Sequence, residues 1–88
     1  MLKTTYFSDE IRCLNSVVHS LRSRYHVETF VRPAYDENIM LSDYVYMMFI
    51  RIREDLELQV SISLIGYQCK PRKTLSEILK LIKERESK

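Results

Sequence analysis

Residues 44–64 have the sequence YVYMMFIRIREDLELQVSISL, in which two stretches alternate between apolar and mixed residues. Alternation with a period of two is typical of β-strands, because successive side chains of a strand point to opposite faces of a sheet. The charged pair Glu54 and Asp55 separates the two stretches. The segment therefore predicts a β-hairpin with one strongly apolar face, and hence a fold built on an antiparallel sheet.

The loop of this hairpin can be predicted from the side chains that each register brings together. A two-residue loop would place Arg53 opposite Leu56 and mix arginine into the apolar face. A three-residue loop over residues 53–55 keeps the apolar residues together and brings Arg51 opposite Glu57. The pairs on the apolar face are then Ile52 with Leu56, Ile50 with Leu58, Met48 with Val60 and Tyr46 with Ile62. We expect the three-residue loop, because a one-residue slip turns a whole strand's side chains to the wrong face.

Amphipathic helices are predicted at both ends of the chain. Ser8 can cap a helix over residues 9–24, because a serine hydroxyl accepts from free amides of a first helical turn. The apolar stripe of this helix consists of Ile11, Leu14, Val18, Leu21 and Tyr25. The second helix is predicted to begin at Thr74, since Thr74 and Glu77 have the spacing of a capping box. Its stripe consists of Leu75, Ile78, Leu79 and Ile82.

A first strand is predicted over residues 27–32, which alternate and are β-branched. We expect Pro33 to end it, because proline has no amide for a ladder, and residues 34–42 to form a loop. A further short strand is possible over residues 3–7. The order helix, strand, strand, strand, helix predicts an α+β fold with a three-stranded antiparallel sheet and two helices on one face, because each helix has a single apolar stripe.

The composition limits the size and class of the protein. With 88 residues, 45% of them apolar and 30% charged, the chain fits one compact domain over residues 1–88. No segment approaches the roughly 18 apolar residues of a membrane span or has the pattern of a secretory signal, so no contact with a membrane is expected. Cys13 and Cys69 are expected to be free thiols and the protein cytoplasmic, because two distant cysteines do not form a disulfide framework.

Residue patterns for catalysis and metal binding are missing from the sequence. Gly66 is the only glycine, which excludes a phosphate-binding glycine loop and a nucleophile elbow. Cys13, Cys69, His19 and His26 lack the paired spacing of zinc ligands. His19 is predicted on the polar side of the helix that contains Cys13, where it would not activate the thiol. We therefore expect no enzyme, no cofactor, no metal and no small-molecule substrate.

The second face of the predicted sheet is the first candidate for binding. It is expected to contain Val45, Met47 and Phe49 from one strand and Ile65 and Tyr67 from its neighbour. Methionine and aromatic residues are enriched at contact surfaces. Either the N-terminal segment or the 34–42 loop covers this patch as core, or the patch binds a second copy or a different protein.

The favoured hypothesis is a non-catalytic interaction or regulatory protein, such as an inhibitor or adaptor, acting through this face or an open strand edge. Small chains of this kind are common among phage and mobile-element accessory proteins.

Basic residues give the alternative hypothesis, a nucleic-acid-binding module. Lys70, Arg72 and Lys73 precede the capped second helix, where side-chain charge and free helix amides together favour a phosphate. Arg22 and Arg24 lie near the end of the first helix and add positive charge. These five residues are the candidates for phosphate contacts.

The order of elements is similar in topology to that of the double-stranded RNA-binding domain. That family has a glycine-proline-histidine type loop between its first two strands and a lysine-studded start to its last helix. The resemblance implies phosphate contacts only for Lys70, Arg72 and Lys73. The corresponding loop in this sequence contains Asp36 and Glu37, whose charges would repel a nucleic-acid backbone.

Overall fold

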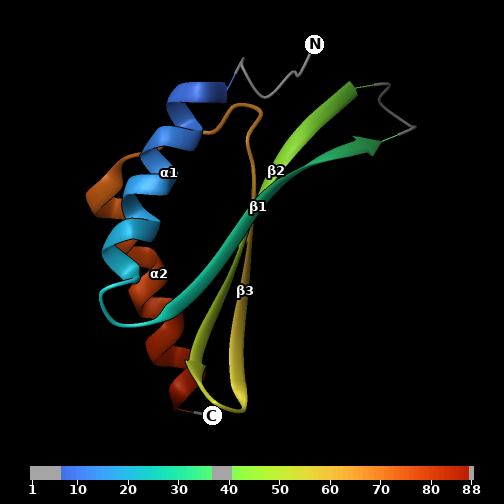
Figure 1. Cartoon of the computed structure of the whole chain (residues 1–88). Coiled ribbons are helices and arrows are strands. Elements are labelled where there is room, and N and C mark those ends of the chain that lie inside the picture. Colours follow the sequence, from blue (N-terminus) through green and yellow to red (C-terminus); the bar gives the residue numbers. More distant parts are fainter. Residues whose placement is uncertain (1–6, 37–40, 88) are drawn as a thin grey trace.

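The computed structural model describes residues 7–36 and 41–87, and contains two helices and three strands. They follow in the order α1 (Ser8–Leu21), β1 (His26–Asp36), β2 (Leu41–Arg53), β3 (Leu56–Ser63) and α2 (Pro71–Glu86). The strands form one antiparallel sheet in the order β1-β2-β3, and both helices lie on the same face of it (Figure 1). The predicted α+β fold is confirmed. The possible strand over residues 3–7 lies outside the described residues, except for Phe7, which packs against Tyr44.

The pairing of β2 with β3 has the predicted register over most of its length. Arg51 lies opposite Glu57, as expected. The confirmed apolar pairs are Ile50 with Leu58, Met48 with Val60 and Tyr46 with Ile62. The apolar residues of both strands therefore share one face, and their burial determines the register in this part of the hairpin.

The turn between β2 and β3 differs from the prediction. Arg53 lies opposite Leu56, so the loop contains only Glu54 and Asp55, and the expected three-residue loop is wrong. The register shifts between Arg51 and Arg53, which places one extra residue on β2. A bulge of this kind allows a tight turn and the apolar pairing to coexist, because it restores the alternation after one unpaired residue.

Strand β1 continues through Pro33 to Asp36, so the prediction that Pro33 ends the strand is wrong and the 34–42 loop is shorter than expected. Pro33 lies opposite Tyr44. The carbonyl of Tyr44 accepts from the amide of Leu64, at 2.8 Å, and therefore points away from β1. Antiparallel alternation then places the missing amide of Pro33 at the outer edge of β1, where no ladder bond depends on it.

The core lies between the helices and the sheet. The stripes predicted for both helices supply it, together with the inner face of the hairpin. Its most buried members are Leu14, Val17, Val18, Leu21, Tyr46, Met48, Ile50, Leu64, Ile78 and Ile82. Ile52, Val60 and Ile62 of the predicted apolar face are only partly buried, and they pack against this cluster together with Tyr44.

Both helices begin without the predicted side-chain caps. Phe7 is the N-cap of α1, and no described side chain bonds to its free amides, so the expected capping by Ser8 is wrong. Helix α2 begins at Pro71 with Lys70 as its N-cap, three residues before the predicted start. Proline is well suited to the first helical position, because its fixed φ matches the helix and its missing amide would have no partner there.

The predicted capping box at Thr74 and Glu77 is therefore wrong. The Thr74 amide donates to the carbonyl of Lys70 at 2.8 Å, which is an ordinary bond within the helix. Thr74 is buried, and its hydroxyl lies 3.0 Å from the hydroxyl of Tyr67. Thr74 thus joins α2 to the segment after β3 instead of starting the helix.

Candidate functional site

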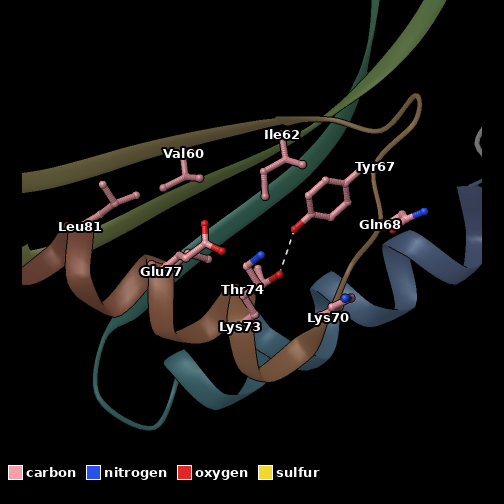
Figure 2. Close-up of a pocket in the computed structure, with 10 residues that line it drawn as sticks. Val60, Ile62, Tyr67, Gln68, Lys70, Lys73, Thr74, Glu77 and Leu81 are labelled. Carbon is pink, nitrogen blue, oxygen red and sulfur yellow. Dashed lines mark hydrogen bonds between the residues drawn. The ribbon is translucent and has the colours of Figure 1, made fainter.

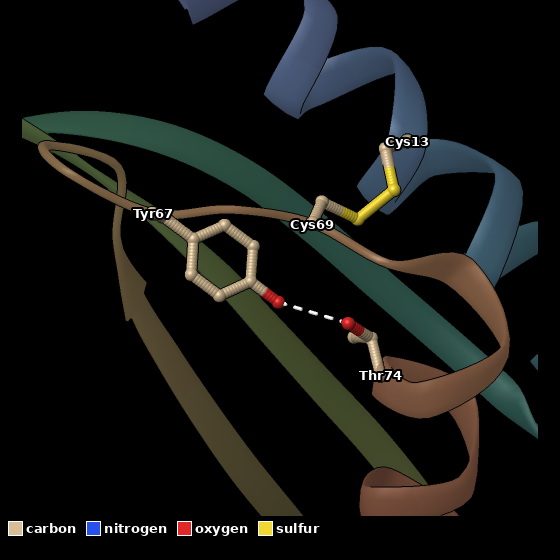
Figure 3. Close-up of a disulfide and its surroundings, with 4 residues drawn as sticks. All are labelled: Cys13, Tyr67, Cys69 and Thr74. Atoms are coloured by element: carbon tan, nitrogen blue, oxygen red, sulfur yellow. Dashed lines mark hydrogen bonds between the residues drawn. A yellow bond between two sulfur atoms is a disulfide. The ribbon is translucent and has the colours of Figure 1, made fainter.

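A disulfide joins Cys13 of α1 to Cys69, in the segment between β3 and α2 (Figure 3). The two Cα atoms are 6.2 Å apart although 56 positions separate the residues in the sequence. This finding contradicts the expectation of free thiols. The fold brings the segment before α2 alongside α1, and that proximity depends on tertiary structure that the spacing of the two cysteines does not indicate.

The outer face of the sheet, opposite the helices, contains a pair of stacked phenylalanines. The rings of Phe30 on β1 and Phe49 on β2 have centroids 5.5 Å apart and planes at 22°. Phe30 is 49% exposed, and neither described helix covers this face (Figure 1). Phe49 was predicted on this face, whereas Phe30 was not. The pairing of Phe30 with Met47 would have revealed it, but that pairing was not predicted.

Met47 lies at the centre of this face and is buried there, at 4% exposure, by its neighbours on the sheet. It lies opposite Phe30 on one side and Ser61 on the other, and the Ser61 hydroxyl donates to its Sδ at 3.3 Å. Val45 is half-buried on the same strand. We call Phe30, Val45, Met47 and Phe49 the outer patch. The pairing of β1 with β2 places these four residues next to one another on one face of the sheet.

The other two predicted interface residues lie elsewhere. Ile65 and Tyr67 were expected on the outer face of the sheet. This expectation is wrong, because strand β3 ends at Ser63 and both residues lie beyond it. Ile65 is 50% exposed in the segment that follows, and its amide donates to Asp43 Oδ1 at 2.9 Å. Tyr67 turns toward the helices and bonds with Thr74 (Figure 3). The change of direction after Ser63 explains why strand-like alternation misplaced both residues.

The basic residues of the alternative hypothesis have different surroundings. Lys70, Arg72 and Lys73 are exposed around the first turn of α2. Arg22 has a structural role, because its Nε and Nη2 donate to the carbonyl of Val27 at 3.2 and 3.1 Å. Arg24 lines a small hollow beside α2. The structure therefore retains one exposed basic cluster, at the start of α2.

A groove of about 370 Å³ lies between β3 and α2 (Figure 2). Val60 and Ile62 line it from β3, and Ile78 and Leu81 line it from α2. Lys70 and Lys73 lie at one end, near the Tyr67 hydroxyl (Figure 2). No pattern in the sequence indicates this groove, because it arises from the position of α2 relative to the edge of the sheet.

Tyr46 is a buried titratable residue on the inner side of the sheet. Burial raises the pKa of its hydroxyl above the ordinary value near 10, against the opposing effects of a hydrogen bond with Thr29 and the charge of Arg22. Its hydroxyl donates to Asn15 Oδ1 of α1 at 2.5 Å. These contacts join α1 to the sheet.

No family model matches the sequence, and no similar curated protein or solved structure was found. Within residues 7–36 and 41–87, no group of three or more histidine, cysteine and acidic side chains is placed to hold a metal ion. In the same part of the chain, neither helix is both long and apolar enough to cross a membrane.

Proposed function

We propose that this protein is a non-catalytic interaction or regulatory protein that binds another protein, or a second copy of itself, through the outer patch. The stacked pair of Phe30 and Phe49, on the face that the described helices leave open, is the observation that supports this proposal. Larger exposed apolar patches, especially those rimmed by polar residues, mark contact surfaces.

The charges around the outer patch fit a protein partner. The register places Arg32 and Arg51 on this face together with Glu28 and Glu57. Positive and negative charges are therefore interspersed, and a phosphate backbone would meet repulsion as well as attraction. Such a balanced surface suits a protein with its own mixture of charges, and it also suits a second copy packed about a two-fold axis.

The size of the face indicates a weak or transient contact. Three strands at a spacing of about 4.8 Å and the eight residues of β3 at about 3.4 Å each give a flat area of roughly 400 Å². A standard interface buries about 800 Å² per partner. A partner that binds tightly would therefore extend over the strand edges as well.

Substitution of Phe30 by aspartate tests the proposal. Phe30→Asp adds a charge that costs little on an open surface but several kcal/mol when an interface desolvates it. Ile65→Asp is the matched control, because Ile65 is equally exposed but lies outside the outer patch. Sedimentation velocity measures self-association, and affinity capture from lysate after nuclease treatment measures partner binding. We expect Phe30→Asp to abolish the contact and Ile65→Asp to preserve it, with unchanged circular dichroism. Equal association of both variants would refute the proposal.

A nucleic-acid-binding module is the second candidate. It is supported by the start of α2 at Pro71, which gathers Lys70, Arg72 and Lys73 around a first turn without an acidic residue. Free amides and positive side chains there favour a phosphate. In this case the double substitution Lys70→Glu with Lys73→Glu should abolish binding to RNA or DNA, and affinity should fall steeply with salt. Phe30→Asp should then have no effect.

A cytoplasmic location stays a prediction. It depended on two free thiols, and the disulfide between Cys13 and Cys69 removes that support, because disulfides persist mainly in oxidising compartments. Acid quenching of cells, followed by alkylation and mass spectrometry, reports whether the two cysteines are oxidised in place. Reduced cysteines would favour the cytoplasm.

A further inference from the structure

Within the described residues, β3 pairs only with β2. The edge of β3 that faces away from β2 is therefore open. The Leu64 amide donates to the carbonyl of Tyr44, so alternate residues before Leu64 direct their backbone groups toward β2. The intervening residues Ser63, Ser61, Gln59 and Glu57 then direct their amides and carbonyls outward. Arg85 supports this assignment, because its Nη2 donates to the carbonyl of Glu57 from α2 at 3.4 Å.

The sheet is narrower than the pair of helices that covers it. Three strands span about 14 Å across the sheet, whereas two contacting helices, each about 10 Å in diameter, span about 20 Å. The groove lies between that edge of β3 and helix α2 (Figure 2). Leu81 points from α2 toward Val60 and is 42% exposed (Figure 2). A fourth strand would widen the sheet to about 19 Å and would cover Leu81.

The middle of the groove is lined by Val60, Ile62 and Leu81 together with the carboxylate of Glu77, and its two ends differ from each other (Figure 2). Lys70 and Lys73 lie at the end toward which β3 runs (Figure 2). At the other end, the carbonyl of Glu57 already accepts a hydrogen bond from Arg85 and is not free to pair with another strand. The stretch left for pairing extends from Gln59 to Ser63, which matches about 17 Å of extended chain.

We propose that the groove binds an extended segment of a partner protein, which adds to β3 as a fourth, antiparallel strand. Apolar side chains at alternate positions of the segment face α2, beside Ile62 and Leu81. An acidic residue at its amino-terminal end lies near Lys70 and Lys73, because an antiparallel strand begins where β3 ends. Main-chain bonds to an open strand edge supply affinity in this mode of recognition, and alternate side chains supply specificity.

A second copy does not fit this position. Antiparallel pairing of β3 with β3 of another copy would set the two edges about 4.8 Å apart and bring the two α2 helices together on one face of the joined sheet, where packed helices require about 8 to 10 Å between their axes. A lone extended segment has no helix to collide with α2. The occupant is therefore a strand of a different chain.

Two fluorescein-labelled peptides test this inference by fluorescence anisotropy. The first has the sequence Asp-Glu-Val-Thr-Val-Thr-Val, and the second has Lys-Lys in place of Asp-Glu. We expect the acidic peptide to bind at least about tenfold more tightly, equivalent to about 1.4 kcal/mol. Substitution of Lys70 and Lys73 by glutamate should reverse this preference. Failure of both peptides to bind, or equal binding of the two, would overturn the inference.

Leu81→Lys tests the apolar contact that α2 offers to the peptide. Ile65→Lys is the matched control, because Leu81 and Ile65 are both exposed in the free protein. Leu81→Lys should lower the affinity for the acidic peptide by about tenfold or more, whereas Ile65→Lys should leave this affinity unchanged. Amide exchange measured by NMR tests the strand itself, since the Gln59 and Ser61 amides should gain protection when the peptide binds. Binding without this protection would contradict strand addition. Phe30→Asp should leave peptide binding unchanged, so failure at the groove and failure at the outer patch can be distinguished.

Discussion

Tyr46 on the central strand donates a hydrogen bond to Asn15 on α1, at 2.5 Å, and thereby connects the helix to the sheet. We expect Tyr46→Phe to lower the free energy of unfolding by about 0.5 to 1.5 kcal/mol, the usual contribution of such a bond. Urea denaturation at pH 7 measures this loss. Asn15→Ala should give a similar value, and a change confined to one of the two variants would show that the bond is not their common cause.

The same hydroxyl predicts a dependence of stability on pH. Because burial raises the pKa of Tyr46 in the folded state, folding favours the protonated form. The contribution is fully present below the unfolded pKa near 10 and is lost as pH rises through the folded pKa. Wild-type protein should therefore lose stability above about pH 10 more steeply than Tyr46→Phe, and the two curves should approach each other. Parallel curves would exclude a raised pKa.

Truncation of the core residues Leu21 and Ile78 tests the packing of the helices on the sheet. Both side chains are almost fully buried, and Leu→Ala or Ile→Ala at such sites costs about 2 to 5 kcal/mol. Leu81→Ala on the exposed side of α2 is the control and should cost much less. Chemical denaturation of the three variants gives the comparison, and a loss below about 1 kcal/mol at Leu21 would mean that its helix face is wrong.

Removal of the disulfide should destabilise the protein substantially. Closing a loop with a sequence separation of 56 stabilises the folded state by about 4 kcal/mol in the chain-entropy model. Replacing both Cys13 and Cys69 by serine, or adding reductant to wild-type protein, should lower the melting temperature. An unchanged melting temperature under reductant would show that the bond does not contribute.

The uncapped start of α2 offers a stabilising substitution. Aspartate at the N-cap accepts from free amides of the first turn and complements the helix dipole, so Lys70→Asp should add about 1 kcal/mol. Glu77→Ala should change stability by less than about 0.5 kcal/mol, because Glu77 is exposed and is not part of a cap. A large loss at Glu77 would instead support a helix that begins at Thr74.

Local patterns predicted much of the fold. The helix stripes were identified because burial repeats every three to four residues, and Leu21 and Ile78 lie where that repeat places them. The hairpin register followed from the requirement that Ile50 and Leu58 share a face. The turn was wrong because a bulge absorbs one residue, at a place where the pairing argument assumed perfect alternation.

Three of the four residues of the outer patch also followed from alternation, namely Val45, Met47 and Phe49. Phe30 was missed because its neighbour on β2 depends on a register between distant segments. Ile65 was misplaced because the carboxylate of Asp43 accepts from the Ser63 hydroxyl and the Ile65 amide, which fixes the chain as it leaves the strand. The disulfide and the groove were not predicted, since both depend on how α1 and α2 lie against the sheet.

The position of the disulfide also determines how the molecule responds to mechanical force. A pull on the two ends of the chain is carried from Cys13 to Cys69 through the sulfur atoms, so the whole sheet lies outside the path of the load. The disulfide prevents the chain between Cys13 and Cys69, about 190 Å long when fully extended, from being stretched. An oxidised molecule pulled at its ends can release only the turns of α1 before Cys13 and helix α2, while a reduced molecule exposes the sheet to rupture.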